Sequence, residues 1–389
     1  MSAKNKRPPF ANAWFFPAAA VYGAFSVSVW ALALLGHITC VPGLCMPAGH
    51  AHEMLFGYGL AVVAGFLLGP QPLPITLGLI LLWLGARISY LVWPASSLAT
   101  ALSILFALGI CIRIVPRFAP SAKKWRNQSV VWMVAALALA NGIAATQGTL
   151  DLDTASVQFA TLILLAGLMF FMGGRIIAPA IAGHITRQGG KLDNRVQPRL
   201  EGAVLICLLG ALAGVLTESM FAFDVVGVAL IAAALSTGIR LARWRVWRCP
   251  GRPDLLMLAL GYGWLTIGMG LLGAARYDLL GTSVAIHALT VGALGTLTIT
   301  VMGRTRLLYR FRDANVAPEA HIAGLLMSAS ALARIFYATE LLPGAASSLL
   351  LTSAALWTLA CLLIFFSLLR TLLPTTSTIQ TGVAKTDFE

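Results

Sequence analysis

Long apolar runs separated by short polar segments make up nearly the whole chain. Each run is about 17 to 22 residues long, the length that an α-helix needs to cross a bilayer. The runs are rich in Leu, Ala and Gly and lack the strict alternation of a half-buried β-strand. The pattern predicts an all-α polytopic integral membrane protein of about twelve transmembrane helices, within one transmembrane domain over residues 1–389. The expected helices are 11–35, 50–69, 75–92, 97–115, 129–147, 156–177, 200–216, 221–241, 254–273, 283–303, 321–341 and 346–370.

Basic residues gather in every second loop between these helices. They lie near 113–126, 187–199, 240–252 and 304–312, whereas the loops on the other side contain one basic residue, Arg276. Because cytoplasmic loops carry the excess of Lys and Arg, both termini are expected to be cytoplasmic. The even helix count permits two six-helix halves, 11–177 and 200–370, followed by a polar tail at 375–389.

Composition excludes a water-soluble protein. Hydrophobic residues make up 59% of the chain and charged residues 11%, against roughly 25% charged in soluble domains. The net charge of +13 would suit nucleic acid, but the basic residues fall in short groups between apolar runs. The lipid bilayer is therefore the expected environment, and nucleic acid is not an expected partner. The sequence leaves the oligomeric state open, and a homo-oligomer is compatible with it.

Few polar residues fall at membrane depth, where each needs a partner or a function. They are His50, His52, Glu53, Arg87, Asn141, Arg175, Asp224, His287 and Arg334. The topology places the three histidines at similar depth in the outer half, together with Arg87 and Arg334. Imidazole nitrogens bind metal or haem iron, and arginines pair with carboxylates such as haem propionates. The alternative is that Arg87 and Arg334 form structural ion pairs with Glu53, Glu218, Asp224 or Glu340.

The spacing of His50, His52 and Glu53 leaves two arrangements open. Helical residues two apart point in nearly opposite directions, so the two histidines either serve different centres or lie in a segment that is not helical. Glu53 is a candidate for orienting a ligand histidine. Cys40 and Cys45 share the preceding outer loop with Met46, where either a disulfide or a Cu(I) site would fit.

Three segments resemble the NnrS family. Residues 50–68 (HAHEMLFGYGLAVVAGFLL) are similar to its HxHEMLFGF…AGFLL signature, and 171–177 (FMGGRII) to its GGR(V/I)I segment. Residues 287–295 (HALTVGALG), with Met302 and Arg304, resemble its HALTVGA…M-x-R block. The chain departs from the pattern at Tyr309 and near Asn141, where a histidine is frequent in the family.

The resemblance implies a multi-pass protein of the bacterial inner membrane that contains haem b, with copper as a second candidate metal, and that takes part in nitric oxide metabolism, denitrification and protection from nitrosative stress. The candidate metal ligands are His50, His52 and His287, and Glu53 is the candidate catalytic residue. Arg87, Arg175, Arg304 and Arg334 are the candidate cofactor-binding residues, Arg175 being the weaker because it lies toward the inner face. The leading hypothesis is an oxidoreductase that acts on nitric oxide with electrons from an unidentified donor. The alternatives are a transporter and a binder without turnover, for a metal or a nitrosyl-metal species.

Overall fold

The structure, a computed structural model, describes residues 9–118, 125–146, 154–217 and 220–373. The polar tail predicted at 375–389 and residues 119–124 of one basic loop lie outside this part. The described residues form helices and no strand. The α-helices are α1 (Asn12–Leu34), α2 (Pro47–His52), α3 (Leu60–Leu67), α4 (Leu73–Val92), α5 (Ser97–Phe118), α6 (Trp125–Thr146), α7 (Thr154–Arg187), α8 (Pro198–Thr217), α9 (Met220–Arg243), α10 (Pro253–Ala275), α11 (Thr282–His287), α12 (Thr296–Phe311), α13 (Pro318–Ala338) and α14 (Ala346–Arg370).

Among the described residues, eleven helices are long and apolar enough to cross a membrane. A further helical run, Pro47–Leu67, passes through α2, the π-helix η2 (Glu53–Gly59) and α3. Large apolar side chains on outward faces remain exposed, as lipid contact requires. Examples are Leu81, Ile112, Trp132, Leu139, Ile206 and Leu235. The predicted all-α multi-pass membrane fold is confirmed, while the side on which the termini lie and the division into two halves stay predictions.

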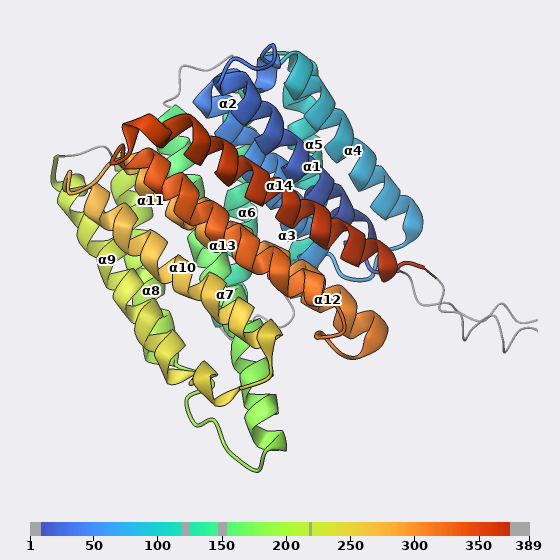
Figure 1. Cartoon of the computed structure of the whole chain (residues 1–389), viewed down its shortest axis with the longest axis vertical. Coiled ribbons are helices and arrows are strands. Elements are labelled where there is room, and N and C mark those ends of the chain that lie inside the picture. The colour runs from blue at the N-terminus through green and yellow to red at the C-terminus, as the bar shows by residue number, and fades with distance from the viewer. Residues whose placement is uncertain (1–8, 119–124, 147–153, 218–219, 374–389) are drawn as a thin grey trace, which may run out of the picture.

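The helices form one bundle in which the two ends of the chain meet. Figure 1 shows α1 in blue beside α14 in red, and these two helices pack together along their length. The α8, α9 and α10 helices form a neighbouring group, and α4, α5 and α6 form another. Because α7 packs against α6, α8 and α10, it joins the two groups through the interior.

The longest helix, α7, continues about three turns beyond the expected end of its apolar run. The prediction ended at 177, whereas the helix ends at Arg187. Hydropathy marks where the lipid-facing stretch stops, but the backbone of a helix can continue into the polar interface with its hydrogen bonds intact. The last turn contains His184 and Arg187, and basic residues there interact favourably with the helix dipole.

Two membrane-crossing helices are interrupted by π-helical segments. In the first, η2 follows His52, and in the second, η5 (Ala288–Gly295) follows His287. A π-helix disturbs the regular i→i−4 bonding, and such segments are frequent at functional sites. Side chains cap carbonyl groups within or beside them: the Trp83 indole donates to the Gly57 carbonyl at 2.9 Å, and the Thr298 hydroxyl donates to the Leu294 carbonyl at 2.6 Å.

The Gly173–Gly174 pair makes room for buried side chains from neighbouring helices. A Cβ on Gly173 would lie 2.5 Å from the Tyr262 ring, and one on Gly174 would collide with the Arg240 guanidinium. Arg240 donates to Glu201 at 2.7 Å and to the Tyr262 hydroxyl at 3.0 Å. These contacts join α7, α8, α9 and α10 in a buried network, which gives the FMGGRII segment a packing role.

Candidate functional site

Glu53 lies at the centre of a buried polar cluster. Its side chain is completely buried and accepts hydrogen bonds from the Tyr22 hydroxyl, from Arg87 Nη1 at 2.5 Å and from His52 Nδ1 at 2.9 Å. The donors come from α1, α4 and α2, so one carboxylate connects three helices. A buried carboxylate with a paired arginine and two further donors is well compensated for the loss of water. We call Tyr22, His52, Glu53 and Arg87 the Glu53 cluster.

The cluster continues through Arg87 toward α5 and α6. Arg87 Nη2 donates to the Ser103 hydroxyl at 3.1 Å, and the Asn141 amide donates to the Ser103 carbonyl at 2.9 Å. Of the ion pairs that the sequence left open, the structure contains the pair of Arg87 with Glu53. Nothing in the sequence marks Tyr22 or Ser103 as part of a site, because an isolated hydroxyl in an apolar helix has no characteristic spacing.

His52 presents one ring nitrogen that has no partner. Because Glu53 pairs with the Arg87 guanidinium, its carboxylate is the acceptor in this bond, which assigns the proton to His52 Nδ1. This leaves the lone pair on Nε2, which is buried without a hydrogen-bond partner. The ring stacks on Tyr90 with 4.0 Å between the ring centroids, which fixes its plane. A histidine held through one nitrogen by a carboxylate, with the other nitrogen free, is the usual arrangement of a metal ligand.

His287 is oriented in a similar way by the backbone. Its Nδ1 lies 2.7 Å from the Ser283 carbonyl oxygen, one turn earlier in α11. Because a carbonyl oxygen only accepts, Nδ1 carries the hydrogen and Nε2 carries the lone pair. The residue is half-buried at the start of η5, just as His52 directly precedes η2. The two π-helices therefore each follow a histidine with an available Nε2.

His50 and Arg334 lie near His287. Both His50 and Arg334 are close enough to His287 to affect it electrostatically. The His50 ring stacks on Trp30 with centroids 5.0 Å apart, and its Nδ1 is buried without a hydrogen-bond partner. Arg334 lies over the Tyr337 ring at 4.6 Å, and its Nη1 is also buried without a partner. Arg334 is therefore available to an anionic group beside the two histidines.

The three histidines thus fall into two groups. His52 belongs to the Glu53 cluster, while His50 stacks on Trp30 and lies near His287 and Arg334. The short segment that contains His50 and His52 is helical, so these two side chains point in different directions. This favours the first of the two arrangements that the spacing left open, in which the histidines serve different centres. Within the described ranges, no three His, Cys, Asp or Glu side chains gather closely enough to hold a metal ion.

Two of the four candidate cofactor arginines lie away from the histidines. Arg304 donates to Asp254 at 3.1 Å, near the opposite end of the helix that begins beside His287. Arg175 lies over the Phe118 ring at 5.9 Å, at the end of α5. Of the four candidates, Arg87 bonds within the Glu53 cluster, and Arg334 lies near His50 and His287. The sequence could place these residues by depth along a helix, but not by the face on which they lie.

Cys40 and Cys45 form a disulfide in the loop before α2. Of the two alternatives for this loop, the structure contains the disulfide, so neither sulfur is a free thiolate for copper. Disulfides persist in oxidising compartments, so the bond agrees with the predicted position of this loop on the outer side of the membrane.

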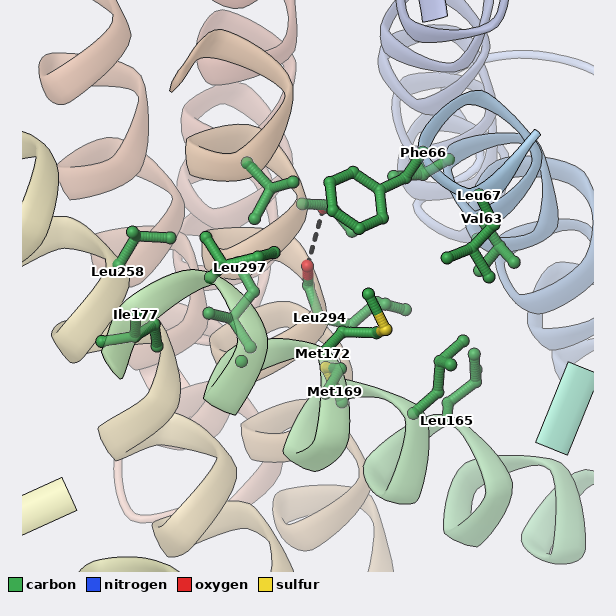
Figure 2. Close-up of a pocket in the computed structure, with 17 residues that line it drawn as sticks. Val63, Phe66, Leu67, Leu165, Met169, Met172, Ile177, Leu258, Leu294 and Leu297 are labelled. Carbon is green, nitrogen blue, oxygen red and sulfur yellow. Dashed lines mark hydrogen bonds between the residues drawn. The ribbon is translucent and has the colours of Figure 1, made fainter. Parts of the chain in front are cut away.

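An apolar cavity lies beside the two interrupted helices. Its volume is about 90 Å³, and almost all of its lining is apolar. Figure 2 shows Val63 and Phe66 of α3, Met169 of α7, Leu258 of α10 and Leu294 of η5 converging on it. Beside it, the Tyr58 hydroxyl and the Thr298 hydroxyl lie 2.6 Å apart and connect the two interrupted helices. A cavity of this size and polarity suits a small neutral molecule and not an ion.

Comparison with protein families identifies the family of this chain. The family model described as "NnrS protein" matches residues 12–375, nearly the whole chain. The chain belongs to the NnrS family. Membership in NnrS marks it as a membrane protein connected with nitric oxide. A comparison with curated proteins found no match.

Proposed function

We propose that the protein is a haem-containing oxidoreductase of the bacterial inner membrane that binds nitric oxide and supports its reduction. The observation that carries the proposal is the pair of histidines, His52 and His287, each placed before a π-helix with Nδ1 donating and Nε2 available. Family membership supplies the connection with nitric oxide.

The residues present fit haem better than a metal ion bound by protein alone. A porphyrin brings four nitrogen ligands, so one or two histidines complete the coordination of its iron. His287, His50 and His52 are the candidate ligands, and each has a nitrogen without a hydrogen-bond partner or with its lone pair free. Arg334, whose Nη1 has no partner, would pair with a propionate. Copper is the candidate second metal. Within the described residues, no cluster of three His, Cys, Asp or Glu side chains is present to hold it.

When bound, haem would supply an iron that takes nitric oxide and passes single electrons. The chain's own residues would hold and isolate that group. Ser283 and Glu53 fix the tautomers of His287 and His52, which keeps each Nε2 unprotonated and directed away from the helix backbone. We propose Glu53 as the acid–base group for proton delivery. The Tyr22 hydroxyl, which donates a hydrogen bond to Glu53, is the neighbouring source of the proton.

The apolar cavity supports a route for the gas. Nitric oxide is small and neutral, and it reaches a membrane protein readily through lipid. Val63, Met169 and Leu294 offer no hydrogen bond to water or ions, so the cavity favours an apolar molecule over a solvated one. Electrons would come from a donor outside this chain.

An optical spectrum of the purified protein tests the proposal. We expect a Soret band that shifts on reduction with dithionite and again on addition of nitric oxide. His287→Ala and His50→Ala are expected to lower the haem content per chain by about tenfold or more, because each removes a candidate ligand. His321→Ala, at the start of α13, is the control and should retain the wild-type spectrum. The absence of a Soret band, or a band unaffected by both substitutions, would contradict the proposal.

A transporter is the second candidate function, since interrupted helices also form substrate sites in transporters. The two functions differ in occupancy. A redox protein should hold haem in stoichiometric amounts through purification, whereas a transport site should exchange its metal with added chelator. Consumption of nitric oxide at an electrode in the presence of a reductant separates turnover from simple binding.

A further inference from the structure

A second cavity lies near the opposite end of the bundle from the histidines. Its volume is about 500 Å³, and it lies between the end of α7, the start of α10 and the end of α12. We call it the arginine cavity. Its polar lining consists of Arg187, Arg252, Arg304, Arg312, Asp313 and Asn315. The distribution of loop charge predicts that this end of the bundle faces the cytoplasm.

The arginine cavity carries more positive than negative charge. Four guanidinium groups line it, and the carboxylates that contact them or the cavity are Asp254 and Asp313. Asp254 accepts two hydrogen bonds from Arg252, both 2.8 Å, and one from Arg304 at 3.1 Å. Asp313 accepts from the backbone amide of Asn315 at 2.9 Å. Among the residues that the structure describes, two carboxylates therefore face four guanidiniums, and an excess of two positive charges remains.

The four arginines form an inner and an outer pair. Arg252 and Arg304 are half-buried and held in place by Asp254, with side-chain exposures of 18% and 16%. Arg187 and Arg312 are exposed and have no hydrogen-bonding or ionic partner in the described part of the chain. The four guanidinium groups that line the arginine cavity repel one another, and an anion in the cavity would balance their charge. The inner pair is preorganised, and the outer pair can close on a ligand.

The chemistry of the lining selects a phosphate group. Guanidinium forks match the geometry of phosphate oxygens and bind them bidentately. The remaining wall, Pro179, Ala180 and Leu308, is apolar, as suits a headgroup whose glycerol portion leaves toward lipid. Basic pockets between helices at the cytoplasmic surface are typical sites for anionic phospholipid headgroups. We propose that the arginine cavity binds a phosphate-bearing anion, either the phosphodiester headgroup of an anionic phospholipid or a soluble phosphate.

The test compares two probes on the full chain in a neutral detergent. Phosphatidylglycerol and inorganic pyrophosphate are titrated separately, with phosphatidylcholine as the neutral lipid control, and the melting temperature is followed. We expect a saturable rise for the wild type with at least one anionic probe. In Arg187→Gln/Arg312→Gln, the apparent dissociation constant should rise by about tenfold or more, because charged hydrogen bonds to the ligand are lost.

A matched variant separates a built site from general charge attraction. Arg243→Gln/Arg248→Gln removes two exposed arginines from the same end of the bundle and should bind as the wild type does. A saturable response to phosphatidylglycerol assigns the lipid headgroup, and a response to pyrophosphate assigns a soluble phosphate. No saturable response to either probe, or equal weakening in both double variants, would overturn the proposal. The measurement needs neither haem nor nitric oxide, so it is independent of the proposed function.

Discussion

Replacing Arg87 by Ala is expected to lower the free energy of unfolding by about 3–5 kcal/mol. The guanidinium pairs with the fully buried Glu53 carboxylate at 2.5 Å and also donates to Ser103. Removing it leaves a carboxylate without a counter-charge in an environment that water does not reach, and the connection between η2, α4 and α5 is lost. Equilibrium unfolding in mixed detergent and SDS micelles measures the change.

Two further variants separate the lost charge from the lost packing. The double variant Glu53→Gln/Arg87→Met leaves no buried charge, so it should recover much of the stability that Arg87→Ala loses. Tyr22→Phe removes one hydroxyl donor and should cost about 1 kcal/mol. If Arg87→Ala unfolds as the wild type does, or if the double variant is the least stable of the three, the ion pair does not hold the cluster together.

Replacing Gly268 by Ala is expected to lower the free energy of unfolding by about 1–3 kcal/mol. A Cβ at this position would lie 2.7 Å from the Leu289 Cα and 2.9 Å from the Leu289 nitrogen. These are backbone atoms of η5, two residues after His287, so the π-helix must move away from α10. We therefore expect a fall in thermal stability together with a changed haem spectrum, because the displacement reaches the candidate ligand.

Gly270→Ala is the matched control on the same helix. Its Cβ would meet the Ala234 Cβ at 3.6 Å, an ordinary contact, so the substitution should be neutral or stabilise by up to about 1 kcal/mol through helix propensity. Equal stability and equal spectra for the two alanine variants would show that close packing of α10 on η5 is not needed.

The candidate site combines features that the sequence predicted with others that it did not. Of the nine polar residues predicted at membrane depth, the structure brings six into the two histidine groups, namely His50, His52, Glu53, Arg87, His287 and Arg334. Asn141 joins them through Ser103, whereas Arg175 lies over the Phe118 ring and Asp224 is exposed. The sequence offered no reason to expect Tyr22 or Tyr90, whose roles depend on neighbours far away in the chain. The sequence also placed Arg304 among the candidate cofactor-binding residues, whereas in the structure Arg304 pairs with Asp254 in the arginine cavity.

The sequence by itself determined the all-α membrane fold and the approximate helix ranges. A bilayer demands about 20 consecutive apolar residues and internal satisfaction of every backbone group, and both demands are visible along the chain. The tertiary structure decided which polar side chains meet. That outcome depends on the rotation of each helix about its axis and on its packing against helices distant in sequence. His52 bonds to Glu53, whereas His50, two residues earlier, stacks on Trp30 and lies near His287 and Arg334. The π-helices that follow both histidines depend on the same packing, since side chains from neighbouring helices and turns cap their carbonyl groups.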